Sequence, residues 1–193
     1  MEKINTIQQT YCDAMKNLPA DDINKIYHDN FYGFPISCDN DLFERLVLEI
    51  NQAGLSWSTI LKKQANFQKA YDNFDIKKVA RYDENDKQRL LNDSGIVRNR
   101  LKIEAAIFNA TVILELQKEF GSFQNWLLFH HSKTKIEWVK LFKKTFKFTG
   151  GEIVGEFLMS IGYLEGAHTK ECCIYPKVIA MKPKWVGNKD VLL

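Results

Sequence analysis

The sequence lacks any apolar run that approaches the length of a membrane span, and residues 1–17 lack the apolar segment of a secretory signal. It also contains no internal repeat, no low-complexity linker and no convincing β-strand pattern. Hydrophobic residues make up 45% of the chain, which is enough for a packed core and excludes a disordered protein. We therefore expect a cytoplasmic, all-α protein without membrane contact, in which residues 1–193 form a single unit.

The sequence also has little excess of charge of one sign. The formal net charge is only +3. From His130 to the end, 11 residues are basic and 6 are acidic, whereas the rest of the chain holds 16 and 18. A basic C-terminal third fits contact with phosphates, although an ordinary lysine-rich surface explains so small an excess equally well.

Cysteine is scarce, and the four in the chain are Cys12, Cys38, Cys172 and Cys173. Because a cytoplasmic protein keeps its thiols reduced, we expect metal binding or plain burial for these residues rather than disulfide bonds.

An acidic residue interrupts the apolar face of the helix predicted from Leu42. Leu42, Leu46 and Ala53 recur at helical spacing, and Glu49 falls on the same face. A carboxylate in that position must be paired with a cation, protonated, or used to bind a ligand or in catalysis, because burying an unpaired anion costs too much free energy. Glu49 and the nearby Trp57 suit a pocket wall for a flat, electron-poor ligand. The alternative is a glutamate hydrogen-bonded to backbone at a helix end.

Capping residues and periodicity predict the helix boundaries. Asp41 is expected to cap the central helix, with Glu44 reaching back as in a capping box, and Ser56 is expected to cap the next helix. Besides the central helix, the predicted helices span residues 3–17, 22–27, 57–73, 75–81, 84–92, 99–120, 123–130 and 153–161.

A basic stripe leads into a glycine-containing hairpin at residues 146–151. Helix, hairpin and helix in this order have the form of a helix-hairpin-helix, in which free backbone N–H groups face a DNA phosphate. Helix pairs in any all-α protein turn in a similar way, so the basic stripe is what supports this hypothesis. The stripe consists of Lys140, Lys143, Lys144 and Lys147, and the expected phosphate contacts are Lys147, Thr149, Gly150 and Gly151.

Several segments resemble, in order, the motifs of the bacterial DNA-3-methyladenine glycosylase I family. The resemblance covers about residues 25–175. The segment at 42–57 is similar to the family's LFExLxLExxQAGLSW, 27–33 to YHDxEWG, 60–63 to ILKKR, 93–100 to DxGIIRNR, 146–150 to GFKFVG, and 167–172 to the H-x-x-x-C ending.

This resemblance implies a helix-hairpin-helix DNA glycosylase fold with two helical lobes that flank a base pocket. The lobes are expected at residues 1–40 plus 130–193 and at residues 41–129. The implied activity is that of a monofunctional base-excision repair enzyme, a hydrolase that removes 3-methyladenine from alkylated double-stranded DNA. It would act as a monomer, without an organic cofactor and without a lyase step.

The resemblance also assigns roles to residues of the pocket. Alkylation at N3 makes adenine cationic, so its N-glycosidic bond is already weak, and the enzyme must mainly extrude and hold the base. By resemblance, Glu49 is the catalytic residue and contacts the base edge, Trp57 stacks on the base, and Tyr27 and Tyr32 complete the base-binding set. The aspartate that most helix-hairpin-helix glycosylases use after the hairpin is missing, as in this family. Glu165 lies near its place and is interpreted as a surface residue, with assistance to catalysis as the alternative.

A structural zinc site is implied at Cys12, His28, His168 and Cys172. Four protein ligands leave no open position for water, so such a zinc ion would clamp the two ends of the chain and not take part in catalysis. The sequence around Cys12 departs from the family pattern, which leaves Cys38 and Cys173 as alternatives for this ligand. The other interpretation is a buried thiol beside a solvated histidine.

Some positions differ from the family pattern. They are Phe31, Tyr32, Ile50, Asn51 and the pair Gly151-Glu152, and the segment at 131–146 is short. These differences keep two further hypotheses open. One is a non-catalytic or substrate-shifted DNA-binding protein on the glycosylase scaffold, and the other is a zinc-stabilised helical interaction protein that does not touch DNA.

Overall fold

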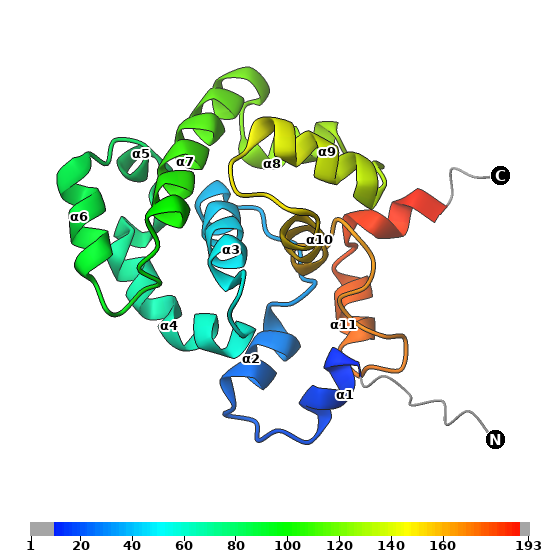
Figure 1. The fold of residues 1–193 in the computed structure, drawn as a ribbon. Helices are drawn as coiled ribbons and strands as arrows, with labels where there is room; N and C mark the ends of the chain where they lie inside the picture. Colours follow the sequence, from blue (N-terminus) through cyan, green and yellow to red (C-terminus); the bar gives the residue numbers. More distant parts are fainter. Residues whose placement is uncertain (1–9, 190–193) are drawn as a thin grey trace, which may run out of the picture.

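Residues 10–189, which the computed structural model describes, fold into helices joined by short connections (Figure 1). No strand occurs in this part of the chain, which confirms the all-α prediction. Within the same residues, no helix combines the length and apolar character that crossing a bilayer requires. The α-helices are α1 (Tyr11–Lys16), α2 (Ile23–Asn30), α3 (Asp39–Gln52), α4 (Trp57–Ala70), α5 (Ile76–Val79), α6 (Glu84–Asn92), α7 (Arg100–Phe120), α8 (Phe123–Phe129), α9 (Lys135–Thr145), α10 (Gly151–Ser160) and α11 (Tyr175–Ala180), with 3₁₀ helices η1 (Asp72–Phe74) and η2 (Lys184–Lys189).

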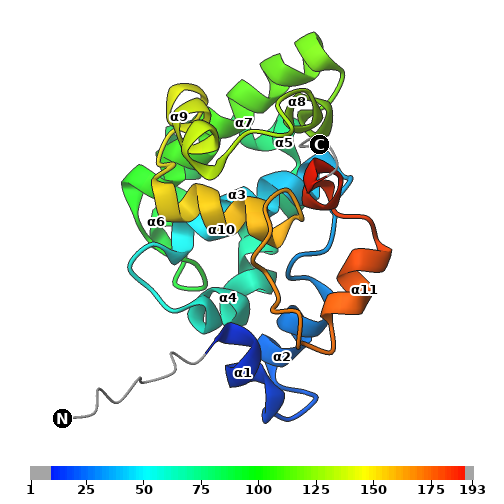
Figure 2. The same ribbon diagram turned by 90° about the vertical axis from the view of Figure 1, so that its right-hand side faces the viewer.

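Helix α3 runs through the middle of the fold and packs against α4, α7, α8 and α10. Helix α10 lies alongside it in both views (Figure 1, Figure 2). Most of α3 is buried because it has neighbours on several sides, and Glu49 is buried with it. The central position of the helix predicted from Leu42 is thus what places a carboxylate inside the protein.

Capping hydrogen bonds set the starts of several helices, and Ser56 caps its helix as predicted. Ser56 accepts a hydrogen bond from the backbone of Thr59 at the start of α4, and Asn99 accepts one from Lys102 at the start of α7. Asp83 forms a capping box at the start of α6, and the left-handed Gly121 ends α7. Local side-chain chemistry is sufficient to set these boundaries.

The predicted start of the central helix was wrong. Helix α3 begins at Asp39, and its N-cap, Cys38, makes no side-chain hydrogen bond. Asp41 therefore lies in the first turn instead of capping it. The Glu44 carboxylate does not reach back either, because it accepts hydrogen bonds from glutamine side chains of α4, Gln64 at 2.7 Å and Gln68 at 3.0 Å.

Asp39 instead caps a helix that is distant in the sequence. Its carboxylate accepts hydrogen bonds from the backbone N–H groups of Phe123 (2.8 Å) and Gln124 (3.0 Å) and from the side chain of Gln117 (2.7 Å). The first turn of α8 is thereby fixed to the first turn of α3. A negative charge at the N-terminus of α8 is also favoured by the helix dipole.

The N- and C-terminal elements differ from the prediction in length. Thr10 caps α1 in a capping box with Asp13, so α1 begins at Tyr11, and residues 3–9 of the predicted helix lie outside the described residues. Helix α2 extends the predicted 22–27 helix to Asn30. Neither α11 nor η2 was predicted.

The main hydrophobic core extends from Leu42 to Tyr163 and is rich in aromatic side chains. Two smaller clusters join the ends of the chain, one around Cys12 and Cys172 and the other around Tyr27 and Tyr32. The main core draws residues from both predicted lobes, and the division into lobes stays a prediction.

Candidate functional site

A cavity of about 410 Å³ opens between the end of α3 and the start of α10. This volume is within the range of small-molecule sites. All four residues predicted to bind a base line the cavity. Its lining consists of Tyr11, Tyr27, Tyr32, Glu49, Gln52, Trp57, Glu152 and Glu156.

Glu49 is only 4% exposed. Burial raises the pKa of its carboxyl to about 8; the guanidinium of Arg45 opposes this rise, and the carboxylate of Glu156 adds to it. Among the described residues, none donates a hydrogen bond to the Glu49 carboxylate. The alternative of a glutamate tied to backbone is therefore not what the structure has, and the carboxylate is available to a ligand in the cavity.

The wall beside Glu49 is aromatic. The rings of Tyr27 and Trp57 lie 5.0 Å apart, those of Tyr27 and Tyr32 lie 5.7 Å apart, and Tyr11 meets Tyr32 edge-on at 5.5 Å. The indole N–H of Trp57 and the hydroxyl of Tyr11 are buried without a hydrogen-bond partner among the described residues. Buried polar atoms are normally paired, so these two atoms are exceptions within the cavity wall.

Arg45 is a buried residue of the site that the sequence analysis missed. Its Nη1 donates a 2.7 Å hydrogen bond to the hydroxyl of Tyr27, and its guanidinium lies 4.9 Å from the centre of the same ring. The residue stands one helical turn before Glu49, so the spacing within α3 could have revealed it. It fixes Tyr27 and brings a positive charge near Glu49.

Helix α10 contributes two carboxylates that were not predicted. The hydroxyl of Tyr32 donates a 3.0 Å hydrogen bond to Oε2 of Glu156, which lies inside the cavity wall. Glu152 lies at the cavity mouth with its side chain 91% exposed, 3.8 Å from Nζ of Lys135. The exposed Glu165, considered as an assisting residue, does not line the cavity.

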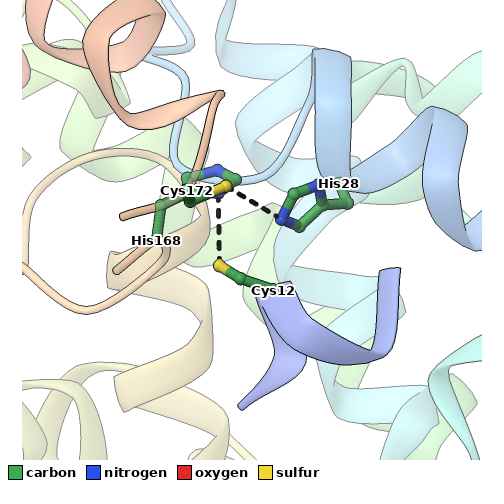
Figure 3. A group of neighbouring side chains, drawn as sticks. All are labelled: Cys12, His28, His168 and Cys172. Atoms are coloured by element: carbon green, nitrogen blue, oxygen red, sulfur yellow. Dashed lines mark hydrogen bonds between the residues drawn. The ribbon is translucent and has the colours of Figure 1, made fainter. Parts of the chain in front are cut away.

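The four predicted metal ligands come together in the structure (Figure 3). Nδ1 of His168 lies 3.8 Å from the sulfur of Cys12 and 3.6 Å from that of Cys172, and Nε2 of His28 lies 3.7 Å from the sulfur of Cys172. All four ligand atoms lie within 4.8 Å of one another, and all four residues are buried. Such separations fit a tetrahedral ion with bonds of about 2.0–2.3 Å.

Both histidines are oriented by a hydrogen bond to the other ring nitrogen. Nδ1 of His28 lies 2.6 Å from the carboxylate of Asp29, and Nε2 of His168 lies 2.7 Å from the backbone oxygen of Tyr32. This is the usual arrangement around a metal-binding imidazole. Cys38 and Cys173 are exposed and lie outside the cluster, so the structure brings Cys12, rather than either alternative, to this site.

The helix-hairpin-helix geometry is present between α9 and α10. No described group accepts a hydrogen bond from the backbone N–H of Gly150 or Gly151, and a side chain added at either glycine would meet open space. The backbone is thus accessible to a phosphate. The hydroxyl of Thr149, in contrast, is buried and bonded to backbone oxygens of Phe142 and Phe146, so this side chain shapes the hairpin.

The side chain of Asn109 on α7 anchors the hairpin. Its amide oxygen accepts a 2.8 Å hydrogen bond from the backbone N–H of Lys147, and its amide nitrogen donates to the backbone oxygen of the same residue at 3.1 Å. Lys147 itself is exposed, and its Nζ lies 4.2 Å from the centre of the Phe108 ring. The buried Asn109 was not noticed in the sequence because its partner is distant along the chain.

Comparisons with known proteins identify the family to which the chain is similar. The methyladenine glycosylase family profile matches residues 17–140. DNA-3-methyladenine glycosylase 1 of Escherichia coli (strain K12) is 36% identical over 169 residues, which cover 78% of this chain and 90% of that protein. The DNA-3-methyladenine glycosylase of Haemophilus influenzae is 33% identical over 165 residues, with coverages of 76% and 89%.

Solved structures show the same similarity. 3-Methyladenine DNA glycosylase I from Staphylococcus aureus superposes with a TM-score of 0.74 at 32% identity, covering 81% of this chain and 93% of that one. A variant of 3-methyladenine DNA glycosylase I in complex with 3-methyladenine gives a TM-score of 0.74 at 31% identity, with coverages of 81% and 94%. The chain belongs to the methyladenine glycosylase family.

Proposed function

We propose that this protein is a base-excision repair enzyme that hydrolyses the N-glycosidic bond of 3-methyladenine in alkylated double-stranded DNA. The observation that carries the proposal is the buried Glu49 carboxylate, which faces a 410 Å³ cavity and receives no hydrogen bond from any described residue. The relatives named above are DNA-3-methyladenine glycosylases, which supports the same reaction.

The charge of the lesion explains why this site suits it. A 3-methyladenine nucleotide carries a positive charge on the base, whereas adenine is neutral. Ionised Glu49 is destabilised by burial, and a cation in the cavity offsets that cost while a neutral base does not. The base then leaves as a neutral molecule, so no group has to protonate it. Discrimination therefore rests on Glu49 and on the lesion's charge.

Aromatic side chains hold the extruded base. Trp57 offers a ring face, and Tyr27 is fixed beside it by the hydrogen bond from Arg45. An electron-poor purine stacks well on such rings, and each stacked base contributes roughly 1–3 kcal/mol. Tyr32 completes the aromatic wall, and its ring is smaller than that of the tryptophan in the YHDxEWG motif at this position.

The hairpin between α9 and α10 is the proposed DNA contact. The backbone N–H groups of Gly150 and Gly151 at the start of α10 have no acceptor among the described residues, which supports a phosphate site there. The exposed Lys147 adds positive charge. Thr149 contributes through the shape of the hairpin and its backbone. The bound DNA would lie with the flipped nucleotide at the cavity mouth, which α10 also lines.

We further propose that Cys12, His28, His168 and Cys172 hold a structural zinc ion. Two thiolates and two imidazoles at these separations suit zinc, and a fourth protein ligand leaves no position for water. Tyr11 and Tyr27 each precede a ligand in the sequence, so the zinc ion would stabilise the aromatic wall. We expect a monomer that acts in the cytoplasm.

The experiment that tests the function is incubation with duplex DNA treated with a methylating agent, followed by chromatography of the released bases. Release of 3-methyladenine, with unmodified adenine left in the DNA, is the expected result. A protein that binds an abasic-site analogue but releases no base would instead be a non-catalytic DNA-binding member of the family. Release of a different methylated base would indicate a shifted substrate.

A further inference from the structure

Glu156 brings a second carboxylate into the cavity from the helix that follows the hairpin. The Tyr32 hydroxyl donates to its Oε2 at 3.0 Å, and no described group donates to its Oε1. One oxygen of Glu156 is therefore fixed in orientation by the wall, and the other remains able to accept a hydrogen bond from a ligand. Glu49 on α3 and Glu156 on α10 line the same cavity.

We propose that Glu156 is a second recognition residue for the extruded base, which together with Glu49 selects positively charged purines. This assignment rests on the proposed function, because it presumes that the cavity receives a base. The negative charge of Glu156 opposes ionisation of Glu49 in the empty cavity, and a cation that enters between the two groups removes this opposition. A neutral purine gives no such relief and is disfavoured.

The charged and titratable groups around Glu49 are consistent with this role. The guanidinium of Arg45, on the same helix, is the positive charge that acts on Glu49, and the tyrosines of the wall are neutral at physiological pH. From α10, Glu156 raises the pKa of Glu49 in addition to the larger effect of burial. Besides Glu49, the titratable groups that line the cavity are Tyr11, Tyr27, Tyr32, Glu152 and Glu156.

Binding of a cationic base should consequently release a proton. Below pH 8 the carboxyl of Glu49 is largely protonated in the empty cavity, because its pKa is about 8. A bound cation favours the carboxylate, so the proton leaves Glu49 for solvent. A site in which Glu49 were already ionised would take up the same ligand with no proton released.

The variant Glu156→Gln tests the negative charge of Glu156 separately from the shape of its side chain. Glutamine has the same shape, and its amide oxygen still accepts the hydrogen bond from Tyr32, so the wall is retained. Glu152→Gln is the matched control, since it removes the same charge one turn earlier on the same helix. Its side chain is 91% exposed and lies near Lys135, so its effect on the cavity is screened.

The test measures binding of 3,9-dimethyladeninium, a permanent cation, and of neutral 9-methyladenine by quenching of tryptophan fluorescence. We expect wild type to prefer the cation, Glu156→Gln to lose about tenfold of this preference, and Glu152→Gln to lose less than about twofold. In addition, the acid limb of kcat/KM for 3-methyladenine release should move to lower pH in Glu156→Gln. If Glu156→Gln lowers kcat/KM by the same factor at every pH and leaves the preference for the cation over 9-methyladenine unchanged, the assignment is overturned.

Wild type alone provides a second measurement that does not depend on the variant's folding. Calorimetry of 3,9-dimethyladeninium binding at pH 6.5, in buffers with different ionisation enthalpies, should show release of about one proton. Binding with no proton released overturns the proposal. If wild type releases no base from methylated DNA, yet prefers the cation and loses that preference in Glu156→Gln, the proposed function is overturned and the role of Glu156 in cation recognition is supported.

Discussion

The Nε2 atom of His168 lies 2.7 Å from the backbone oxygen of Tyr32, and this contact joins the cluster of Cys12, His28, His168 and Cys172 to the cavity. The side chain of the same Tyr32 lines the cavity and donates a hydrogen bond to Glu156. Tyr11 and Tyr27 stand next to Cys12 and His28 in the sequence. Three tyrosines of the cavity wall are thus tied to the Cys/His cluster, one through a hydrogen bond and two through adjacency in the sequence.

Loss of the metal should therefore destabilise the protein and impair base release. Protein purified without added zinc is expected to contain about one zinc ion per chain. Cys172→Ser should lose that zinc, and its melting temperature should fall by about 10 °C. Metal analysis and thermal unfolding measure both effects. The exposed neighbour Cys173 is the matched control, and Cys173→Ser should resemble wild type. A Cys172→Ser protein that keeps its zinc and its melting temperature would refute the assignment.

Gly33 follows Tyr32 and packs against Ala167 and His168. Its replacement by alanine should destabilise the folded protein. Its φ is +82°, and an added Cβ would lie 2.7 Å from Cβ of Ala167. Gly54 has nearly the same φ, +83°, but open space around it. Urea unfolding should show a loss of about 3–4 kcal/mol for Gly33→Ala and about 1–2 kcal/mol for Gly54→Ala. Equal losses would show that the contact with Ala167 contributes nothing.

The stacking role of Trp57 predicts a graded response to substitution. Trp57→Ala removes the ring and should lower kcat/KM for 3-methyladenine release by about 10- to 100-fold. Trp57→Phe keeps an aromatic face and should retain a larger share of the activity. Because Trp57 is only partly buried, thermal unfolding should show a folded protein in both cases. The stacking assignment fails if the alanine variant is as active as the phenylalanine variant.

The raised pKa of Glu49 predicts how stability depends on pH. The folded protein holds this proton more tightly than the unfolded chain does, since the pKa is about 8 in the fold and about 4.5 without it. Stability contributed by the protonated group is complete below pH 4.5 and is lost as the pH rises through 8. Glu49→Gln avoids this loss, so its melting temperature should exceed that of wild type by about 5 °C at pH 9 and by little at pH 4.5. A difference that does not vary with pH would contradict the burial of a titrating carboxyl.

The sequence predicted those parts of the fold that depend on neighbouring residues. Ser56, Asp83 and Asn99 cap their helices through hydrogen bonds within three residues, and such interactions are visible in the sequence. The start of α3 was missed because the carboxylate of Asp39 accepts hydrogen bonds from the backbone of α8. Only the folded chain creates this contact. The short α11 was missed for a similar reason, since it packs with Cys12 across the two ends of the chain.

The candidate site shows the same limit. Glu49 was identified because it interrupts an apolar helix face, and the motif resemblance placed Tyr27, Tyr32 and Trp57 beside it. Glu156 lies more than a hundred residues further along the chain and carries no local pattern, so only the packing of α10 on α3 brings it into the cavity. Spacing likewise could not select Cys12 from the three candidate cysteines, because only the folded chain brings α1 next to the loop that carries His168 and Cys172.

The most direct test of the central claim is the rate at which wild type and Glu49→Gln release 3-methyladenine from methylated duplex DNA at pH 8. Base chromatography gives the rate, and thermal unfolding shows that both proteins are folded. Glu49→Gln should be slower by about 10²-fold, because it cannot present an anion to the cationic base. A variant that releases 3-methyladenine as fast as wild type would contradict the role of the Glu49 carboxylate.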